Sequence, residues 1–277
     1  MASGRQQGTK WFISSFNRSN LQYEVRPKKG KGVSHDIASF IKSKHKGHSG
    51  IVYCLSRNEC DTVASELESS GIIAKPYHAG LNDNQRTTVQ DQWVKDRVHV
   101  IVATIAFGMG VDKPDVRFVI HFSIPKSLEG YYQESGRAGR DGRKSVCILY
   151  YCLADVTRMR KLITSDKSVS PNALRIHEAN LQTMISYCED EVECRRVMQL
   201  KHFGEVFDPK KCKMSLATCD NCRDSGRQEK KDLTSLSKSI MKGIERLQGL
   251  SGYSGKFTLN HVVEVLRGSK SKKIIQC

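Results

Sequence analysis

The sequence predicts an α/β fold built on a parallel β-sheet, followed by a smaller helical part. Short runs of β-branched and aromatic residues recur between about residues 50 and 151, and they are continuously apolar, as expected for strands buried on both faces. Stretches with helical periodicity separate these runs. After about residue 152 the strand-like runs stop, and helical stretches with a cysteine-rich segment follow.

Five segments are expected to form the strands: 51–55, 72–77, 98–103, 118–122 and 146–151. Helices are predicted between them, and two begin with a capping-box pattern. Ser56 with Glu59, and Asn82 with Gln85, have the spacing at which two residues bond each other's backbone N–H at a helix start. A further helix is expected around 127–136. Residues 26–32 (RPKKGKG) are expected to form a basic turn.

The second half has a different organisation. Residues 153–164 and 172–203 have helical patterns, 204–226 are rich in Cys, Lys, Asp and Gly, and 227–232 are a charged linker. A helix is predicted at about 233–248, and the short amphipathic stretch 257–266 precedes a basic tail. Residues 1–14 show no periodicity and stay unassigned.

Composition and charge narrow the class of protein. The chain has 277 residues, of which 38% are apolar and 27% charged, as in soluble globular proteins. There is no apolar run of membrane-spanning length and no signal-peptide core, so neither membrane insertion nor secretion is expected. The net charge is +16, and residues 1–150 and 151–277 each carry +8. Such a charge favours a polyanionic partner, of which nucleic acid is the commonest. A basic soluble protein without such a partner is the alternative.

Four of the ten cysteines have the spacing of a metal site. Cys219 and Cys222 form a C-x-x-C knuckle, Cys212 lies seven residues before it, and Cys194 is on the preceding helical stretch. Four thiolates fit a closed tetrahedral Zn²⁺ site, which is structural rather than catalytic. Cys188 is an alternative fourth ligand, and loop thiols or a redox C-x-x-C are alternatives to the metal. Cys54, Cys60, Cys147 and Cys152 are expected to be buried small hydrophobes.

The segment 131–142 (YYQESGRAGRDG) carries a phosphate-binding pattern. Arg137 and Arg140 are three residues apart, so one helical turn would place both on the same side. Two planar, permanently charged guanidinium groups suit the γ-phosphate of a nucleotide. A solvated basic turn is the simpler alternative.

Two upstream segments follow predicted strands. In 103–115 (ATIAFGMGVDKPD), Thr104 and Gly108 come at a strand end, where α/β proteins bind ligands. Thr104 could donate to a phosphate, and Asp112 could accept from a ribose hydroxyl. In 77–81 (YHAGL), His78 ends another strand, and a turn with a satisfied histidine is the alternative.

Taken together, YHAGL, ATIAFGMGVDKPDVRFVIH and YYQESGRAGRDG resemble motifs IV, V and VI of a superfamily 2 helicase of the RecQ family. Segments 15–21, 53–61 and 155–158 add to the resemblance, which covers roughly residues 15–273. It implies a second RecA-like lobe at 15–152, a zinc-binding subdomain at 153–225 and an incomplete winged-helix domain at 226–277. It also favours Cys194, which the run Glu-Cys-Arg-Arg contains, over Cys188 as zinc ligand.

The resemblance assigns roles to residues. Arg140 is implied as the arginine finger and Arg137 as a second γ-phosphate contact. Asp112 and Gln133 join them as nucleotide-binding residues, with Asp112 on the ribose. Arg57, His78 and Thr104 are implied to hold the phosphates of a DNA strand. ATP and Mg²⁺ are the implied cofactors of the intact enzyme, beside structural Zn²⁺. Single-stranded and branched DNA are the implied partners, and the nucleus is the implied location.

One departure from the family is large. The chain contains no G-x-x-x-x-G-K-[ST] and no Asp-Glu-x-His sequence, which the first RecA-like lobe would supply. We therefore expect a fragment, a truncated gene model or a splice form that is inactive alone. The predicted function is the C-terminal part of an ATP-dependent 3′-to-5′ DNA helicase core, acting in repair and recombination. A DNA-binding or regulatory module without enzymatic activity is the alternative, and an RNA helicase lobe is a third reading.

Overall fold

The computed structural model describes residues 14–108, 112–165, 169–226, 231–249 and 258–268. The chain divides into two compact units, residues 1–226 and 227–277, and each is described by itself. Predictions that fall on 1–13, 109–111, 227–230, 250–257 and 269–277 lie outside the described residues.

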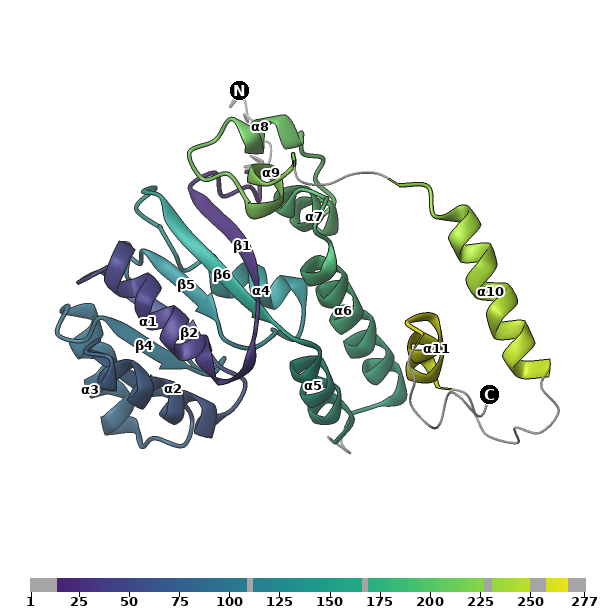
Figure 1. The fold of residues 1–277 in the computed structure, drawn as a ribbon. Coiled ribbons are helices and arrows are strands. Elements are labelled where there is room, and N and C mark those ends of the chain that lie inside the picture. Colours follow the sequence, from purple (N-terminus) through teal and green to yellow (C-terminus); the bar gives the residue numbers. More distant parts are fainter. Residues whose placement is uncertain (1–13, 109–111, 166–168, 227–230, 250–257, 269–277) are drawn as a thin grey trace, which may run out of the picture. The chain divides into compact units, whose positions relative to one another are not determined.

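A six-stranded sheet, in which all strands are parallel, forms the centre of the first unit and confirms the predicted fold class (Figure 1). The strands are β1 Leu21–Pro27, β2 Gly50–Tyr53, β3 Ala74–Tyr77, β4 Val100–Ala103, β5 Phe118–His121 and β6 Ser145–Tyr151. Their order in the sheet is β1-β6-β5-β2-β4-β3. Strands β2, β4 and β5 are buried at every position, which explains their continuously apolar sequences.

Two elements at the start of the sheet escaped the sequence analysis. Strand β1 and helix α1 (Val33–Lys44) precede the first predicted strand, and the expected basic turn at 26–32 overlaps the end of β1 and a short 3-10 helix, η1 (Gly30–Gly32). As an edge strand, β1 alternates buried Leu21 and Tyr23 with half-buried Gln22 and Glu24. This short alternation is a weaker signal than the buried runs elsewhere in the sheet.

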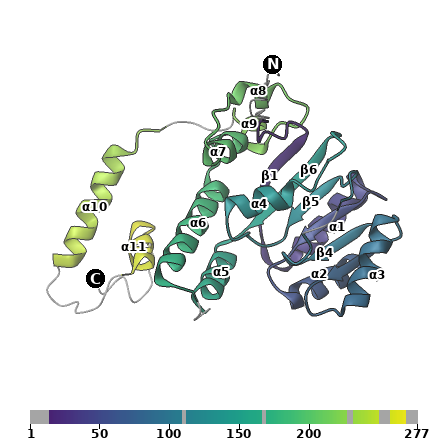
Figure 2. The ribbon, with the colours of Figure 1, turned by 180° about the vertical axis from the view of Figure 1, so that it is seen from behind.

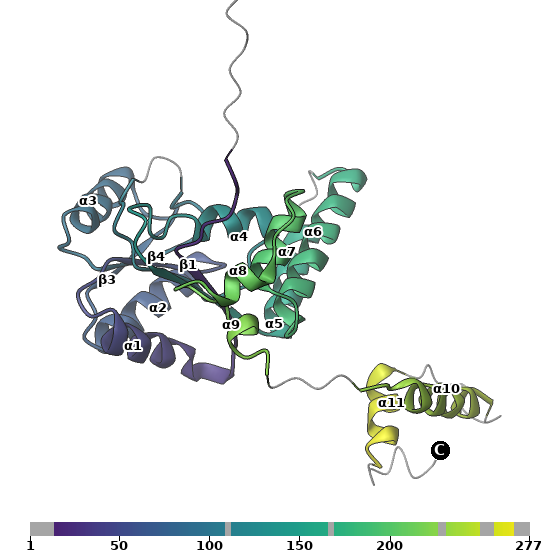
Figure 3. The ribbon, with the colours of Figure 1, turned by 90° about the horizontal axis from the view of Figure 1, so that it is seen from above.

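Helices cover both faces of the sheet. On one face α1 and α2 (Arg57–Ser69) bury a core with Ile37, Phe40 and Leu67. On the other face lie α3 (Asp83–Val94), α4 (Leu128–Ser135) and α6 (Pro171–Glu189), around a core that includes Trp93 and Tyr131 (Figure 3). The loops after β2, β4 and β5 thereby meet at one edge, the carboxyl edge of the sheet.

The two predicted capping boxes differ. At α3 the Asn82 side chain accepts from Gln85 N–H and the Gln85 side chain accepts from Asn82 N–H, so the full box forms. At α2 only half forms: Ser56 accepts from Glu59 N–H, but the Glu59 carboxylate accepts from Leu55 N–H instead. Partners from other elements hold the Glu59 carboxylate in this position, and the sequence does not reveal these partners.

The zinc-binding part of the first unit consists of helices, of which α7 and α9 pack against β1 (Figure 2). These are α5 Leu153–Ser165, α6, α7 Arg195–His202, and the short α8 Pro209–Lys213 and α9 Asp220–Arg223. The predicted helical region 172–203 is thus two helices, with a break at which Cys194 lies. The second unit contains α10 (Thr234–Gly249) and α11 (Leu259–Leu266). None of the helices in the described part of the chain is long and apolar enough to span a membrane.

Candidate functional site

Polar side chains gather at the carboxyl edge of the sheet. A hollow of about 250 Å³ opens there, lined among others by Cys54, Thr104 and Ser123, which follow β2, β4 and β5. Thr104 is half-buried, and its hydroxyl oxygen accepts from Ala106 N–H at 3.4 Å. Parallel strands end at the same edge, so three loops far apart in the sequence supply one site.

Arg57 and His78 lie together around Gly80. A Cβ atom on Gly80 would come within 3.1 Å of His78 Nδ1 and 3.2 Å of Arg57 Cδ, so glycine allows this close approach. His78 is only 5% exposed, and both of its ring nitrogens are engaged. Nδ1 accepts from Gly80 N–H at 3.2 Å, and Nε2 lies 3.0 Å from Asp61 Oδ1. The geometry therefore gives His78 a role in holding the turn, whereas the exposed Arg57 side chain can reach a ligand.

Arg137 and Arg140 lie just after a helix and not on a helical turn. Helix α4 ends at Ser135, close to the end of the helix expected around 127–136, and both arginines lie in the turns that follow it. Their three-residue spacing would place them on one side of a helix, but the chain turns here, and Gly139 has a φ of 53°. Both side chains nevertheless reach the loop after β4.

The partners of the two arginines differ. Arg137 Nη1 donates to the Gly108 carbonyl, and a Cβ on Gly108 would lie 3.0 Å from Arg137 Nη2. Arg137 Nε is buried and has no hydrogen-bond partner within the described residues. Arg140 Nη1 donates to Asp112 Oδ1 at 2.9 Å, in an ion pair in which the Asp112 side chain is 85% exposed. Arg140, the predicted arginine finger, and Asp112, the predicted ribose contact, thus form an ion pair with each other in this structure.

The position of the loop after β4 is held from the core. Tyr53, on β2, donates its hydroxyl to the Phe107 carbonyl at 2.9 Å, beside the Arg137 contact. Burial raises the pKa of Tyr53 well above its ordinary value, so the hydroxyl keeps its proton. Gln133 is exposed on α4, one turn before Arg137. The structure thus brings Arg137, Arg140 and Asp112 together at this loop.

The four predicted cysteines form one buried cluster. The sulfur atoms of Cys194, Cys212, Cys219 and Cys222 all lie within 4.8 Å of one another, and Cys194 Sγ is 3.9 Å from Cys219 Sγ. A tetrahedral ion with Zn–S bonds of about 2.3 Å requires sulfur atoms about 3.8 Å apart. The cluster therefore fits a structural zinc ion. Cys188 is buried on α6 and lies outside this cluster. Cys152 was predicted to be buried, but it is half-buried.

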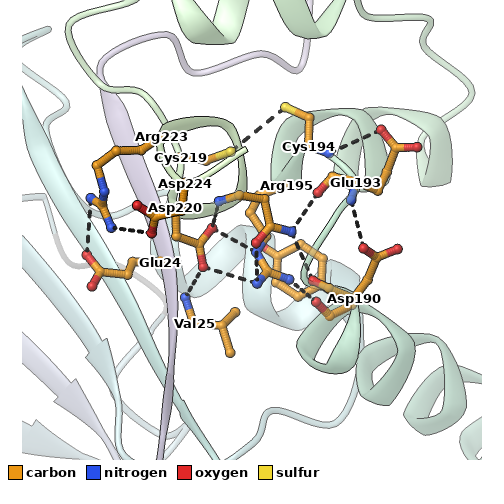
Figure 4. Close-up of polar contacts among 12 residues, drawn as sticks. Glu24, Val25, Asp190, Glu193, Cys194, Arg195, Cys219, Asp220, Arg223 and Asp224 are labelled. Carbon is orange, nitrogen blue, oxygen red and sulfur yellow. Dashed lines mark hydrogen bonds and ion pairs between the residues drawn. The ribbon is translucent and has the colours of Figure 1, made fainter. Parts of the chain in front are cut away.

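Polar contacts around the cysteines attach them to β1, and the sequence analysis missed them (Figure 4). Asp220, inside the C-x-x-C knuckle, accepts from the Val25 backbone N–H at 2.8 Å and from Arg195 Nε at 2.9 Å. Arg196 donates to the carbonyls of Arg18, Ser19 and Leu21. Both arginines are 2% exposed. Two adjacent arginines after a metal-ligand cysteine were the available signal, but their acceptors lie up to 179 residues away.

Three family models match consecutive parts of the chain. The helicase conserved C-terminal domain matches residues 33–142, the RecQ zinc-binding domain 153–223, and the RQC domain 227–277. The first match, with the parallel sheet, makes this chain the C-terminal part of a helicase core. The zinc-binding and RQC matches specify the family: the chain belongs to the RecQ-type helicases.

Several curated proteins are similar to the chain over nearly its whole length. The RecQ-like DNA helicase BLM of Xenopus laevis is 50% identical over 95% of this chain and 20% of its own length. The RecQ-like DNA helicase blm-1 of Caenorhabditis elegans is 45% identical over 97% of this chain and 27% of its own length. The ATP-dependent helicase SGS1 of Saccharomyces cerevisiae is 43% identical over 95% of this chain and 18% of its own length. The chain therefore spans about a quarter or less of the first relatives it matches.

Proposed function

We propose that this chain is the nucleotide-sensing and strand-gripping part of an ATP-dependent DNA helicase that moves 3′ to 5′. The observation that carries the proposal is the convergence of Arg137 and Arg140 on the loop that holds Gly108 and Asp112. The names of the relatives, which describe DNA helicases and an ATP-dependent helicase, support it. In this proposal ATP lies between this lobe and a first RecA-like lobe that carries the Walker lysine and holds Mg²⁺.

The ion pair of Arg140 with Asp112 suggests how the nucleotide is sensed. An exposed ion pair contributes only about 0–1 kcal/mol, so a triphosphate can displace the carboxylate from Arg140 at little cost. Arg140 would then neutralise charge that develops on the γ-phosphoryl group, and Asp112 would accept from the ribose. Arg137 would supply a second γ-phosphate contact from its fixed position against Gly108, and Gln133 would contact the nucleotide from α4.

For DNA, we propose that Arg57 and Thr104 hold successive phosphates of one strand along the carboxyl edge, while His78 keeps the Gly80 turn in place for Arg57. Such contacts position a strand without reading its sequence. The zinc ion would be structural, because four cysteine ligands leave no open coordination position. Single-stranded and branched DNA would be the substrates, in repair and recombination in the nucleus.

The test joins this chain to a first RecA-like lobe from one of its relatives. The joined protein should hydrolyse ATP only with DNA present and unwind a duplex with a 3′ single-stranded tail, but not one with a 5′ tail. Hydrolysis without any dependence on DNA, or unwinding from the 5′ tail, would contradict the proposal.

A DNA-binding or regulatory module without enzymatic activity is the second candidate. The observation that favours it is that the given sequence contains no Walker A motif to accompany the proposed γ-phosphate contacts. Salt-dependent DNA binding by a joined protein that never hydrolyses ATP would select it.

A further inference from the structure

A basic groove lies along β1 and β6 at the edge of the sheet, beside α1. Figure 1 shows where these three elements lie. It consists of two hollows of about 430 and 470 Å³ that share Arg26, Phe40 and Lys44. We call it the β1–β6 groove. Five cationic side chains line it: Arg26, Lys29, Lys44, Lys144 and Arg223. Its two carboxylates are Glu24 and Asp36, and the charge of the lining is therefore positive.

The sheet explains why the cations are in line. Strand β1 alternates, so Gln22, Glu24 and Arg26 line the groove while Leu21 and Tyr23 are buried in the core. In the parallel register Leu21 pairs with Ser145, next to Lys144, and Arg26 pairs with Tyr150. The cations therefore extend along the whole strand, which is about 20 Å for seven residues. A single anion would use one of these positions, whereas a linear polyanion would use them all.

Tyr150 supplies an independent sign of a ligand. This residue is only 1% exposed, lines the groove, and its hydroxyl makes no hydrogen bond of normal geometry with any described residue, although the Arg26 guanidinium lies nearby. Burial raises the pKa of Tyr150, so the hydroxyl carries a proton that it can donate. Buried hydroxyl groups are nearly always satisfied, and an oxygen of a bound phosphate would satisfy this one.

Two arginines of the groove make ionic contacts with nearby carboxylates. Arg26 Nε donates to Glu24 at 2.8 Å, and the guanidinium lies beside the Tyr150 hydroxyl, so a second anion at this place would contact both groups. Arg223 Nη1 is 4.0 Å from Glu24 and Nη2 is 3.8 Å from Asp224, both near the limit of an ion pair. Burial lowers the pKa of His45, which also lines the groove, to about 4, so this imidazole is neutral at pH 7 and the anion would contact arginine and lysine.

We propose that the β1–β6 groove binds the phosphate backbone of a second segment of single-stranded DNA, apart from the strand held by Arg57 and Thr104. This inference rests on the proposed function, because it assumes that DNA is the polyanion. A single strand fits better than a duplex, because a duplex is too wide for hollows of this size. DNA is favoured over a phosphorylated peptide because the cations lie at both ends of β1 rather than around one phosphate position: Lys144 is next to the residue that pairs with Leu21, whereas Arg26 and Lys29 are near and beyond the end of the strand.

The experiment measures the affinity of the full chain for fluorescent (dT)20 by anisotropy at several salt concentrations. Lys29→Glu with Lys44→Glu reverses two exposed groove charges, and the matched control reverses Lys42 and Lys46, which are equally exposed and do not line the groove. Both pairs place one glutamate in the last turn of α1, so their effects on the helix are alike. The variant with both groove lysines reversed should bind (dT)20 about 10-fold more weakly, and the slope of its log affinity against log salt should be smaller by about 1.4. The affinity of the control variant should change less than about 2-fold.

Tyr150→Phe isolates the hydroxyl. It should weaken (dT)20 binding about 3-fold without changing the salt slope, because one neutral hydrogen bond is lost. If Arg57→Ala with Thr104→Ala weakens binding while both groove variants match the control, the groove inference is wrong and the proposed strand site stands. If only the groove variants weaken binding, the groove is supported and the carboxyl-edge assignment fails. A phosphoserine peptide that binds more tightly than (dT)20, and loses affinity in Tyr150→Phe, would overturn the assignment to DNA.

Discussion

Arg137 and Arg140 differ in how firmly the protein holds them. Arg140 is 38% exposed and pairs with the still more exposed Asp112, so its guanidinium can change partner. Arg137 donates to the Gly108 carbonyl, and its buried Nε finds no partner in the described part of the chain. A buried donor without an acceptor is costly, and a bound anion would relieve that cost.

We predict that Arg140→Ala, in the chain joined to a first lobe, lowers kcat for ATP hydrolysis by about 100-fold or more and leaves nucleotide affinity nearly unchanged. The reason is that the contact forms mainly in the transition state. Arg140→Lys should rescue poorly, because an ammonium group lacks the planar fork. Steady-state kinetics at saturating DNA measures both quantities.

The pair should also behave as one unit. The double variant of Arg137 and Arg140 should lose much less than the product of the two single losses, since either arginine needs the other to stabilise the same phosphoryl group. An intact kcat together with lost DNA binding in Arg140→Ala would mean that this arginine contacts DNA and not ATP.

At the scale of elements, four charged side chains connect β1, α2 and α5. Lys28, which follows β1, lies 2.8 Å from Asp155 of α5 and 3.9 Å from Glu59 of α2. Arg158 of α5 pairs with both carboxylates, at 3.0 Å from Glu59 and 3.2 Å from Asp155. The network lies beside the turn that carries Arg57, so it fixes the start of α2 against the first helix of the zinc-binding part.

We predict that Glu59→Gln lowers the free energy of unfolding at pH 7 by about 2 kcal/mol, because charged hydrogen bonds are lost. Burial alone would raise the pKa of Glu59, but the Leu55 N–H and the Lys28 cation outweigh it and hold this pKa below its usual value. Its stabilisation is therefore present above the ordinary glutamate pKa of about 4.3 and is lost as the pH falls through the lower folded value.

Urea unfolding between pH 7 and pH 3 tests this, with Glu66→Gln, an exposed position on the same helix, as the control. The wild type and the control should lose stability on acidification more steeply than Glu59→Gln. Parallel curves for all three proteins would contradict the prediction.

The cysteine-rich segment should depend on the metal for its folding, because so short a segment has little apolar core of its own. We predict about one zinc ion per chain, and its loss together with much of the helicity of residues 171–223 in Cys219→Ser with Cys222→Ser. Elemental analysis and circular dichroism measure the two effects. Cys188→Ala is the control, because this buried cysteine lies outside the cluster and should leave the zinc content unchanged. Metal-free protein with an unaltered spectrum would disprove the prediction.

At the scale of the whole molecule, the basic charge is evenly distributed, with +8 in each part of the sequence. We predict that binding of the chain to single-stranded DNA is weak and that its logarithmic affinity falls linearly with log salt. Arg57→Ala should weaken binding equally for unrelated sequences, because phosphate contacts carry no base information. Titrations with several oligonucleotides at one salt concentration check this, and a strong preference for one sequence would refute it.

Much of the fold and of the site could be predicted from local patterns. Strands β2, β4 and β5 are buried at every position, and the Asn82 and Ser56 caps depend on residues three positions away, so short windows contain the information. Cys219 and Cys222 were predicted for a similar reason, since C-x-x-C spacing is a local feature, whereas Cys194 was preferred to Cys188 on the resemblance to the family. Strand β1 was missed because only one of its faces is buried, and its charged residues look like part of a turn.

The sequence by itself determined the parallel sheet, the C-x-x-C cysteines and the arginine motif, because each depends on residue types at close spacing. Only the tertiary structure decided the partners of the polar groups. The Asp220 carboxylate accepts from the backbone N–H of Val25, which is 195 positions away, and Arg140 pairs with Asp112. The Glu59 carboxylate accepts from Arg158 instead of completing its capping box. The physical reason is that a buried or paired charge takes whichever partner folding brings within about 3 Å, and chain topology, not sequence distance, decides which partner that is.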